Sequence, residues 1–408
     1  MYYERRRRRP LARAGALRRI VDVVCFGQQN WDFCWTGKQQ LMTRLAARGH
    51  RVLYVDPDLD LDTHALADVV RSVAPLATGL APREVAPRLW VFTQRYSPIL
   101  RWRLSVRRFA RVLRGCLGRL GLERAICLTQ WPRALPLTEL APFAARVHYA
   151  IDEMTAYGGL PEAEQLRTRA LETQLVRRSH RTLAVSPRLV ARLREIQPDT
   201  WLLPSGADVE HFAPQRTAGL PPLPELARLP RPLLGFVGQI DERLDPELLL
   251  AVARRCGGSI VLAGRVKPGV DVSALAACEQ VHFLGHQPFS ALPGLLRDMG
   301  VCLVPFRRNA LTESSSPLKV YDYLAAGKPV VSVPLDGLLE CARVVRLAET
   351  PSAFAAAVAD CLADPEADRD RRLAVAAANS WERRTDALEE HLGAALDTAR
   401  RRAAVAVG

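Results

Sequence analysis

The strongest constraint on the fold is an alternation of short apolar segments with helical segments, which runs through the chain twice. Near the start, apolar runs of strand length at residues 20–26 and 51–55 flank residues 39–47, whose apolar side chains recur at helical spacing. A strand–helix–strand unit of this kind needs a crossover and therefore predicts a parallel sheet. The alternation continues as far as residues 181–185 and predicts about six strands for this first sheet.

The alternation is interrupted once and then restarts. Residues 213–232 contain six prolines, which predict a stiff, extended linker. Beyond it, short apolar runs again alternate with helical segments, and residues 380–402 predict a long, charged amphipathic helix. We therefore expect an α/β protein with two doubly wound, Rossmann-like domains whose ligand-binding edges face a central cleft. The predicted segments are a basic disordered tail (1–19), a first domain (20–212), the linker (213–232), a second domain (233–378) and a terminal helix (379–408).

The charge of the chain is divided unevenly between its halves. The 408 residues have a formal net charge of +14. Residues 1–230 hold 36 Lys and Arg against 21 Asp and Glu, whereas residues 231–408 hold 21 against 22. This asymmetry indicates a polyanionic partner for the first half, which could be nucleic acid, an anionic membrane or a phosphorylated substrate. A basic surface without a specific partner is the alternative.

One helical segment, residues 100–120, is basic, amphipathic and aromatic. Trp102 and Phe109 stand among its apolar residues, and arginines occupy many of the positions between them. Such a helix could lie on an anionic membrane surface, or it could cover the sheet with a charged outer face. Together with the arginines at residues 5–9, it leads us to expect a peripheral association with the inner face of the plasma membrane.

Several classes of protein are disfavoured. No uncharged apolar run reaches the roughly 18 residues of a membrane-spanning helix, and no apolar stretch follows the basic N-terminus, so we expect a cytoplasmic location. The nine cysteines include no C-x2-C pair, and no cluster has the spacing of metal ligands, so no metal site is expected. Asp56 ends the second strand as a ribose-binding acid would. The G-x-G-x-x-G motif of a dehydrogenase is missing, however, between Phe26 and Gln39.

The motif with the clearest chemistry is the loop and helix at residues 312–331. Ser316 suits the N-cap and Pro317 the first helical position, so the start of the helix would present free N–H groups to an anion. Serine hydroxyls and Lys319 beside them would suit a diphosphate. Asp322 lies three residues further on the same helix face, where its carboxylate could accept both hydroxyls of a ribose. A capped core helix with a surface acid and base is the alternative.

This segment, P-L-K-V-Y-D-Y-L-A-A-G-K-P-V-V, resembles the donor-binding helix of family 4 glycosyltransferases, which have the GT-B fold, and especially the bacterial exopolysaccharide and teichuronic-acid-type members. The resemblance extends over most of the chain, because further segments are similar to family motifs in the expected order. These segments are residues 35–57, 203–212, 236–245, 281–293, 301–306 and 379–384. One departure is that the family's Glu-x7-Glu pair is Ser314 and Asp322 here.

The resemblance implies a metal-independent hexosyltransferase that needs no cofactor. Its donor would be a UDP- or GDP-linked sugar, and its acceptor a glycan or a polyprenyl-diphosphate-linked molecule in cell-surface polysaccharide biosynthesis. Transfer would proceed with retention. The terminal helix would cross back to the first domain. No role with nucleic acid is expected, because the sequence contains no recognised nucleic-acid-binding module.

The resemblance also implies roles for individual residues. Asp152, directly after the strand at 147–151, would contact the acceptor or the donor sugar. Arg265 and Lys267 would balance the charge of the leaving diphosphate, with Arg243 as a second candidate. Glu313, next to Ser314, is the nearest carboxylate that could contact the sugar. The expected catalytic residues are therefore Asp152, Arg265, Lys267 and Glu313, and the expected donor-binding residues are Gly238, His286, Ser314, Ser315, Ser316, Lys319 and Asp322.

Two other functions remain open at this point. A sugar-nucleotide epimerase has the same fold and would turn over the donor alone. A catalytically silent binding subunit is suggested by Ser314, since a serine does not supply the carboxylate found at this position in the family. Turnover of the donor with and without an acceptor distinguishes these alternatives.

Overall fold

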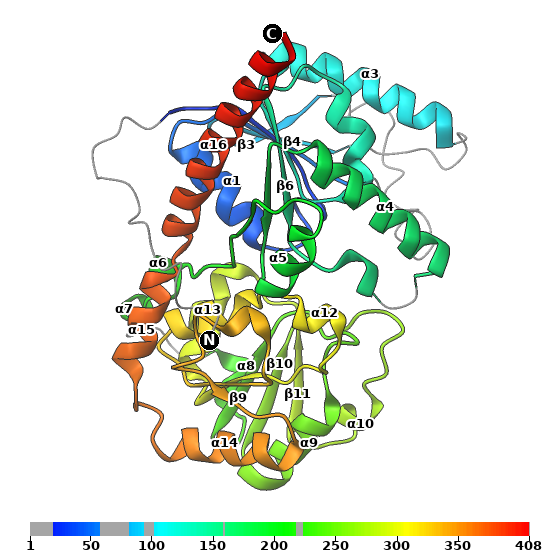
Figure 1. Cartoon of the computed structure of the whole chain (residues 1–408). Coiled ribbons are helices and arrows are strands. Elements are labelled where there is room, and N and C mark those ends of the chain that lie inside the picture. Colours follow the sequence, from blue (N-terminus) through cyan, green and yellow to red (C-terminus); the bar gives the residue numbers. More distant parts are fainter. Residues whose placement is uncertain (1–18, 58–80, 94–101, 158–159, 218–222, 408) are drawn as a thin grey trace.

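The computed structural model describes residues 19–57, 81–93, 102–157, 160–217 and 223–407, with only the backbone for residues 102–108 and 406–407. These residues form two domains, each built on a parallel sheet and placed one above the other in Figure 1. The predicted α/β architecture with two doubly wound domains is confirmed. The expected basic tail lies outside the described residues, apart from Arg19.

The N-terminal domain contains an eight-stranded sheet in the order β3-β4-β2-β1-β5-β6-β7-β8. The six predicted strands are present and nearly all their residues are buried, because neighbouring helices cover both faces of a parallel sheet. They are β1 (Val23–Phe26), β2 (Val52–Val55), β4 (Leu89–Phe92), β5 (Ile126–Thr129), β6 (Ala145–Ala150) and β7 (Arg181–Ala184). Two edge strands were not predicted, namely β3 (Arg83–Ala86), which is antiparallel to β4, and β8 (Thr200–Leu202).

Helices lie on both sides of this sheet, and the second domain lies next to one of its edges (Figure 1). The basic segment forms α3, and its described residues Phe109, Leu113 and Leu117 pack into the core beside β1. This part of the helix therefore covers the sheet, whereas the side chains of residues 102–108 lie outside the description. The elements are α1 (Gly37–Ala47), α3 (Trp102–Leu120), α4 (Glu162–Arg178), α5 (Pro187–Arg194), and the 3-10 turns η1 (Pro132–Glu139) and η2 (Met154–Ala156).

The C-terminal domain contains a six-stranded parallel sheet in the order β11-β10-β9-β12-β13-β14. Its strands are β9 (Leu233–Val237), β10 (Ser259–Ala263), β11 (Val281–Gly285), β12 (Val301–Val304), β13 (Val330–Ser332) and the unpredicted edge strand β14 (Arg346–Leu347). Its helical elements are α9 (Pro246–Cys256), α10 (Ser273–Ala276), η3 (Phe289–Ala291), α11 (Leu292–Asp298), α12 (Ala310–Glu313), α13 (Leu318–Ala325), η4 (Asp336–Leu338), α14 (Pro351–Ala363) and α15 (Arg369–Ala378).

The chain crosses between the domains twice, and the two crossings are hydrogen-bonded to each other. Ala207 N donates to Asn379 O (2.9 Å) and Trp381 N donates to Ala207 O (3.0 Å). After the second crossing, α16 (Trp381–Val407) runs along the N-terminal domain, where Trp381 and Leu388 enter the core (Figure 1). The predicted return of the last helix to the first domain is confirmed.

The proline-rich segment differs from the extended linker that its composition predicts. After α6 (Val209–Phe212), it contains the single-turn helices α7 (Pro214–Thr217) and α8 (Pro224–Ala227). Leu226 of α8 is fully buried in the core of the C-terminal domain. Apolar side chains between the prolines thus anchor the described part of this segment to that domain. Within the described ranges, no helix is long and apolar enough to span a membrane.

Candidate functional site

The loop and helix singled out in the sequence lie at the carboxyl edge of the C-terminal sheet. Helix α13 begins at Leu318, with Pro317 at the N-cap, so the prediction of Ser316 as N-cap is wrong. The Ser316 hydroxyl instead accepts a hydrogen bond from Ser205 N (3.2 Å), and the Ser205 hydroxyl donates to Ser316 O (2.8 Å). Ser316 is therefore used to hold the first domain crossing, and no side chain caps the start of α13.

The two preceding serines belong to the end of α12. Ser314 is the C-cap of that helix and is almost fully buried. The Ser315 hydroxyl donates to Thr312 O (2.7 Å). Both serines shape the turn between α12 and α13, and Ser315 retains the capacity to accept a hydrogen bond.

Lys319, in the first turn of α13, lies at this edge of the sheet. Its Nζ lies 3.6 Å from the centroid of the Phe236 ring and 4.8 Å from that of Phe306. Gly238, with φ +137°, follows β9 directly, and a Cβ atom there would come within 2.8 Å of Lys319 Nζ. Its positive φ favours glycine at 238, and the absent side chain leaves room for the lysine ammonium beside it.

The Lys319 ammonium group is poorly compensated. Burial, and then the charge of Arg243, lower its pKa well below the usual value, while Asp241 opposes this shift. In the part of the chain that the structure describes, Lys319 makes no hydrogen bond or ion pair. A half-buried ammonium with three donors that lies over aromatic rings has unused capacity to bind an anion.

Arg243 accompanies Lys319, although Arg265 and Lys267 were the leading candidates for this role. It is held by Asp241 through a 2.5 Å ion pair and lies over Phe306. Burial opposes the charged form, but Asp241 first, and then Tyr157 and Asp152, raise the pKa of the guanidinium. It comes from the loop after the central strand β9, whereas Arg265 and Lys267 follow β10. The structure thus brings Lys319 and Arg243 together.

Asp322, on the next turn of α13, supplies a buried carboxylate. Its Oδ1 atom has no hydrogen-bond partner among the described residues. Burial raises the pKa of Asp322 well above its usual value, and the charge of Asp208 adds to the shift. Asp208 itself forms an ion pair with Arg44 (3.5 Å). An acceptor atom in this state suits a hydroxyl group of a ligand.

Asp152 faces this site from the N-terminal domain. It follows β6, and its Oδ2 atom accepts hydrogen bonds from the Tyr157 hydroxyl (2.8 Å) and from Gln28 Nε2 (3.4 Å). Burial raises the pKa of Asp152, whereas Tyr157 and Arg243 lower it. Because Arg243 acts electrostatically on Asp152 and on Tyr157, the cation of one domain lies close to the carboxylate of the other.

Arg265 and Lys267 lie beside the loop that carries Arg243, because Ile240 N donates to Arg265 O (2.9 Å) and Lys267 N donates to Ile240 O (2.9 Å). Their side chains, and those of the other predicted residues, make different contacts. Lys267 forms an ion pair with Glu242 (2.8 Å), and Arg265 is exposed, with an electrostatic effect on Cys34. His286 is exposed just beyond β11. Glu313 is bound by Arg188 (2.5 Å) and Arg308 (3.0 Å).

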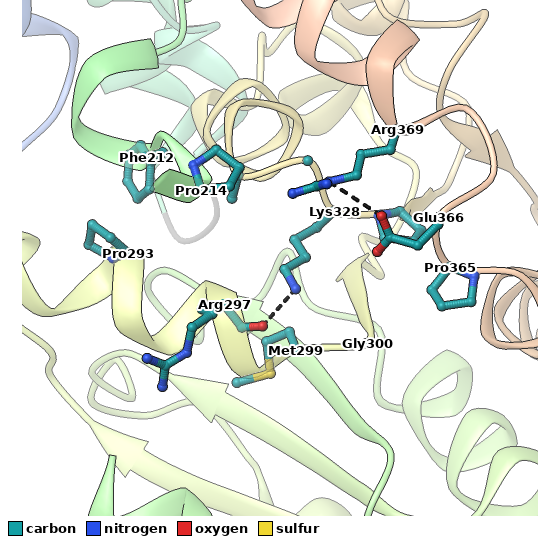
Figure 2. A pocket seen from close by; sticks show the side chains of 13 residues that line it. Phe212, Pro214, Pro293, Arg297, Met299, Gly300, Lys328, Pro365, Glu366 and Arg369 are labelled. Atoms are coloured by element: carbon teal, nitrogen blue, oxygen red, sulfur yellow. Dashed lines mark hydrogen bonds and ion pairs between the residues drawn. The ribbon is translucent and has the colours of Figure 1, made fainter. Parts of the chain in front are cut away.

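Neither a metal site nor a prominent cavity accounts for this arrangement. Among the described residues, no three His, Cys, Asp or Glu side chains converge as metal ligands do. A cavity of about 320 Å³ lies at the opposite, amino end of β12 and β13 (Figure 2). There Lys328 donates to Arg297 O (2.7 Å), and Arg369 pairs with Glu366 (3.4 Å). These charges have partners within the domain, so the cavity is distinct from the site at the carboxyl edge.

Comparison with known proteins connects this site to a family. The family model described as glycosyl transferases group 1 matches residues 231–364, which run from the start of β9 to the end of α14. The putative teichuronic acid biosynthesis glycosyltransferase TuaH of Bacillus subtilis (strain 168) is 27% identical over 106 residues. That match covers 25% of this chain and spans only 27% of the relative.

Solved structures share the whole fold. Sucrose-phosphate synthase from Thermosynechococcus elongatus matches with a TM-score of 0.69 and 18% identity, covering 91% of this chain and 98% of that one. The trehalose 6-phosphate synthase of Burkholderia multivorans matches with a TM-score of 0.62 and 13% identity, covering 96% and 100%. A protein from E. coli solved with UDP-2-fluoro glucose matches with a TM-score of 0.61 and 12% identity, covering 91% and 98%.

The chain therefore has the GT-B fold of these glycosyltransferases. Its C-terminal domain is similar to group 1 glycosyltransferases over residues 231–364. The resemblance predicted from the sequence is confirmed.

Proposed function

We propose that this protein is a metal-independent glycosyltransferase that takes a sugar from a UDP- or GDP-linked donor. The observation that carries the proposal is the unpaired Oδ1 atom of the buried Asp322 on the same helix as Lys319, whose ammonium lies over the Phe236 and Phe306 rings beside Arg243. A nucleotide sugar has matching groups, because its diphosphate accepts hydrogen bonds and its ribose donates them. Binding would convert a poorly compensated pair of side chains into a hydrogen-bonded one.

The chemical step needs stabilisation of a leaving group. The bond between the anomeric carbon and the diphosphate oxygen breaks, and its electron pair leaves with the nucleoside diphosphate. Arg243 and Lys319 would stabilise this negative charge as it develops, because both cations are held in place before reaction. The acceptor hydroxyl forms the new bond to the anomeric carbon and passes its proton to the departing diphosphate oxygen. Asp152, across the domain boundary, would orient that hydroxyl, and we propose transfer with retention.

The charge of the N-terminal half leads to a proposal for the acceptor. We infer a glycan or a polyprenyl-diphosphate-linked molecule used in cell-surface polysaccharide synthesis. The name of the Bacillus subtilis relative and the basic character of residues 1–230 support this proposal. A lipid-linked acceptor would also account for a peripheral membrane association from the cytoplasmic side. Among the roles expected from the sequence, sugar contact by Glu313 is the least supported, because two arginines bind this carboxylate.

Donor screening tests the proposal. We expect UDP- or GDP-sugars to raise the unfolding temperature, because a ligand that binds only the folded state stabilises it. Transfer to an acceptor extract should persist in excess EDTA. Asp152→Asn should bind the nucleotide normally and transfer about 100-fold more slowly, as expected when a positioned carboxylate is lost.

The outcomes separate the alternatives. If no nucleotide sugar stabilises the protein at millimolar concentration, the proposed function is wrong. Binding without turnover identifies a silent binding subunit, which Ser314 in place of a family carboxylate favours. Conversion of the donor without an acceptor identifies an epimerase. Complete loss of transfer in EDTA, restored by Mg²⁺, contradicts metal independence.

A further inference from the structure

Helix α5 carries two arginines, one helical turn apart, that bind carboxylates of different domains. Arg192 pairs with Glu153 (2.9 Å) and Glu172 (2.6 Å), both in the N-terminal domain. Arg188 pairs with Glu313 (2.5 Å), which belongs to the C-terminal domain. Residues four apart lie on the same face of a helix, so this face of α5 touches both sides of the domain boundary.

The Arg192 end of this face fixes the loop that carries Asp152. Glu153 is buried, and its Oε1 atom accepts a hydrogen bond from the Thr155 hydroxyl (2.6 Å). Burial opposes ionisation of Glu172, but the nearby His148 (3.9 Å) and the hydrogen-bonded Arg192 outweigh it and lower the pKa of Glu172 to about 2. Arg192 therefore stands between two carboxylates, of which one immediately follows Asp152. The backbone of η2 is held to α5 through this contact.

The Arg188 end reaches the turn between α12 and α13. Glu313 is the last residue of α12 and precedes Ser314, and its second partner, Arg308, lies within the same domain. Helix α12 also packs against η2. The donor-side turn and the Asp152 loop thus meet at one place, and the Arg188–Glu313 pair is the charged contact that joins them.

We propose that Glu313 and Arg188 form a clamp through which closure of the two domains positions Asp152. The pair couples the turn before α13 to α5, and α5 couples to the Asp152 loop through Arg192 and Glu153. Glu313 is then a positioning residue for sugar transfer, whose carboxylate binds an arginine of the other domain. This inference rests on the proposed function, because it assigns the position of Asp152 to sugar transfer.

The test uses the full-length protein with Arg188→Gln, Glu313→Gln and the double variant. Each single change should lower kcat about fivefold, equivalent to about 1 kcal/mol, the upper range for a partly exposed ion pair. The Kd for the nucleoside diphosphate should stay within twofold, because Lys319, Arg243 and Asp322 are untouched. Amide hydrogen exchange across residues 153–157 should accelerate. The double variant should be no worse than either single variant, since both remove the same contact.

Arg308→Gln is the matched control, because it removes the other ion pair of Glu313 without crossing the domain boundary. It should leave kcat and exchange at residues 153–157 at the wild-type level. Additive effects in the double variant, or an equal effect of Arg308→Gln, would overturn the clamp. If the wild type binds no nucleotide sugar, the proposed function fails instead, and the exchange data alone decide whether the clamp exists: unchanged exchange in Arg188→Gln rejects it.

Discussion

Each domain has a lysine in the first turn of a helix and a buried aspartate near it in the sequence or at the sheet edge, but the two domains use these residues differently. In the N-terminal domain, Lys38 lies in the first turn of α1, and Asp56 directly follows β2. In the C-terminal domain, Lys319 lies in the first turn of α13, and Asp322 lies one turn later. Burial lowers the pKa of both lysines and raises that of both aspartates.

The hydrogen bonds of these four residues show the difference. Lys38 Nζ donates to Cys34 O (2.8 Å) and to the Thr36 hydroxyl (3.3 Å). Asp56 accepts from Trp31 N (2.7 Å) and from the Thr93 hydroxyl. The Oδ1 atom of Asp322 has no hydrogen-bond partner among the described residues, and the half-buried Lys319 lies over the rings of Phe236 and Phe306. Buried polar groups are normally satisfied, so the unpaired carboxylate oxygen of Asp322, on the same helix as the half-buried Lys319, indicates a ligand site, whereas the satisfied pair in the N-terminal domain indicates structure.

The largest expected difference between the domains is in nucleotide affinity, when Lys319 and Lys38 are each replaced by alanine. Lys319→Ala should weaken binding of the nucleoside diphosphate by about 1.5–3 kcal/mol, the range for a charged hydrogen bond. Its folded-state stability should not fall, because the change removes a poorly compensated buried charge. Lys38→Ala should leave the nucleotide affinity intact and lower the free energy of unfolding by about 1–3 kcal/mol, since buried acceptors lose their donor. Calorimetric titration and thermal unfolding of both variants check this. Equal losses of affinity would remove the distinction between the two lysines.

The aspartate pair gives a smaller effect on binding and a distinct dependence on pH. Asp322→Asn retains an acceptor oxygen, so nucleotide affinity should fall by about 1.5 kcal/mol, the lower end for charged hydrogen bonds. The pKa of Asp322 is raised in the folded state. Its carboxyl group therefore favours folding below the unfolded-state pKa, and this contribution is lost as pH rises through the folded pKa.

The wild type should consequently lose stability through this group as the pH rises above about 4. Asp322→Asn should lack this loss and unfold at a higher temperature than the wild type at pH 8. Asp56→Asn serves as the control, because its oxygens already have donors. It should leave nucleotide affinity unchanged. A wild-type affinity in Asp322→Asn would contradict the ribose contact.

The sequence predicted those elements whose burial produces a recognisable local pattern of apolar residues. Buried parallel strands appear as short apolar runs, and α16 appears as a long amphipathic segment. The edge strands were missed because the edge is partly exposed: β3 reads Arg-Glu-Val-Ala, and β8 has only three residues. The prolines of residues 213–232 indicated a break between the two alternating patterns. They gave no sign that Leu226 is buried, because its burial depends on contact with the surface of the C-terminal domain.

The candidate site was predicted in part for the same physical reason. Lys319 and Asp322 follow from helical spacing, since three residues place both on one face. Ser316 was misassigned because its hydroxyl binds Ser205, which is 111 residues away in the chain. Arg243 ranked below Arg265 and Lys267 because only the tertiary fold brings it to Lys319. The Asp-Glu-Arg sequence at 241–243, in the loop after the central strand, was the available signal.

The smallest expected effect is on membrane binding, and its measurement tests whether the basic half of the chain contacts a membrane. Arg111 is exposed on α3 in the basic half, and Arg254 is exposed on α9 in the neutral half. A basic residue near an anionic membrane contributes about 1 kcal/mol, and salt screens this attraction. Arg111→Gln should therefore reduce cosedimentation with vesicles containing anionic lipid about fivefold at low salt, whereas Arg254→Gln should not change it. High salt should release the wild type, and neutral vesicles should bind it weakly. If the two variants behave alike, the charge asymmetry does not mark a membrane-facing surface, and a soluble acceptor becomes the better proposal.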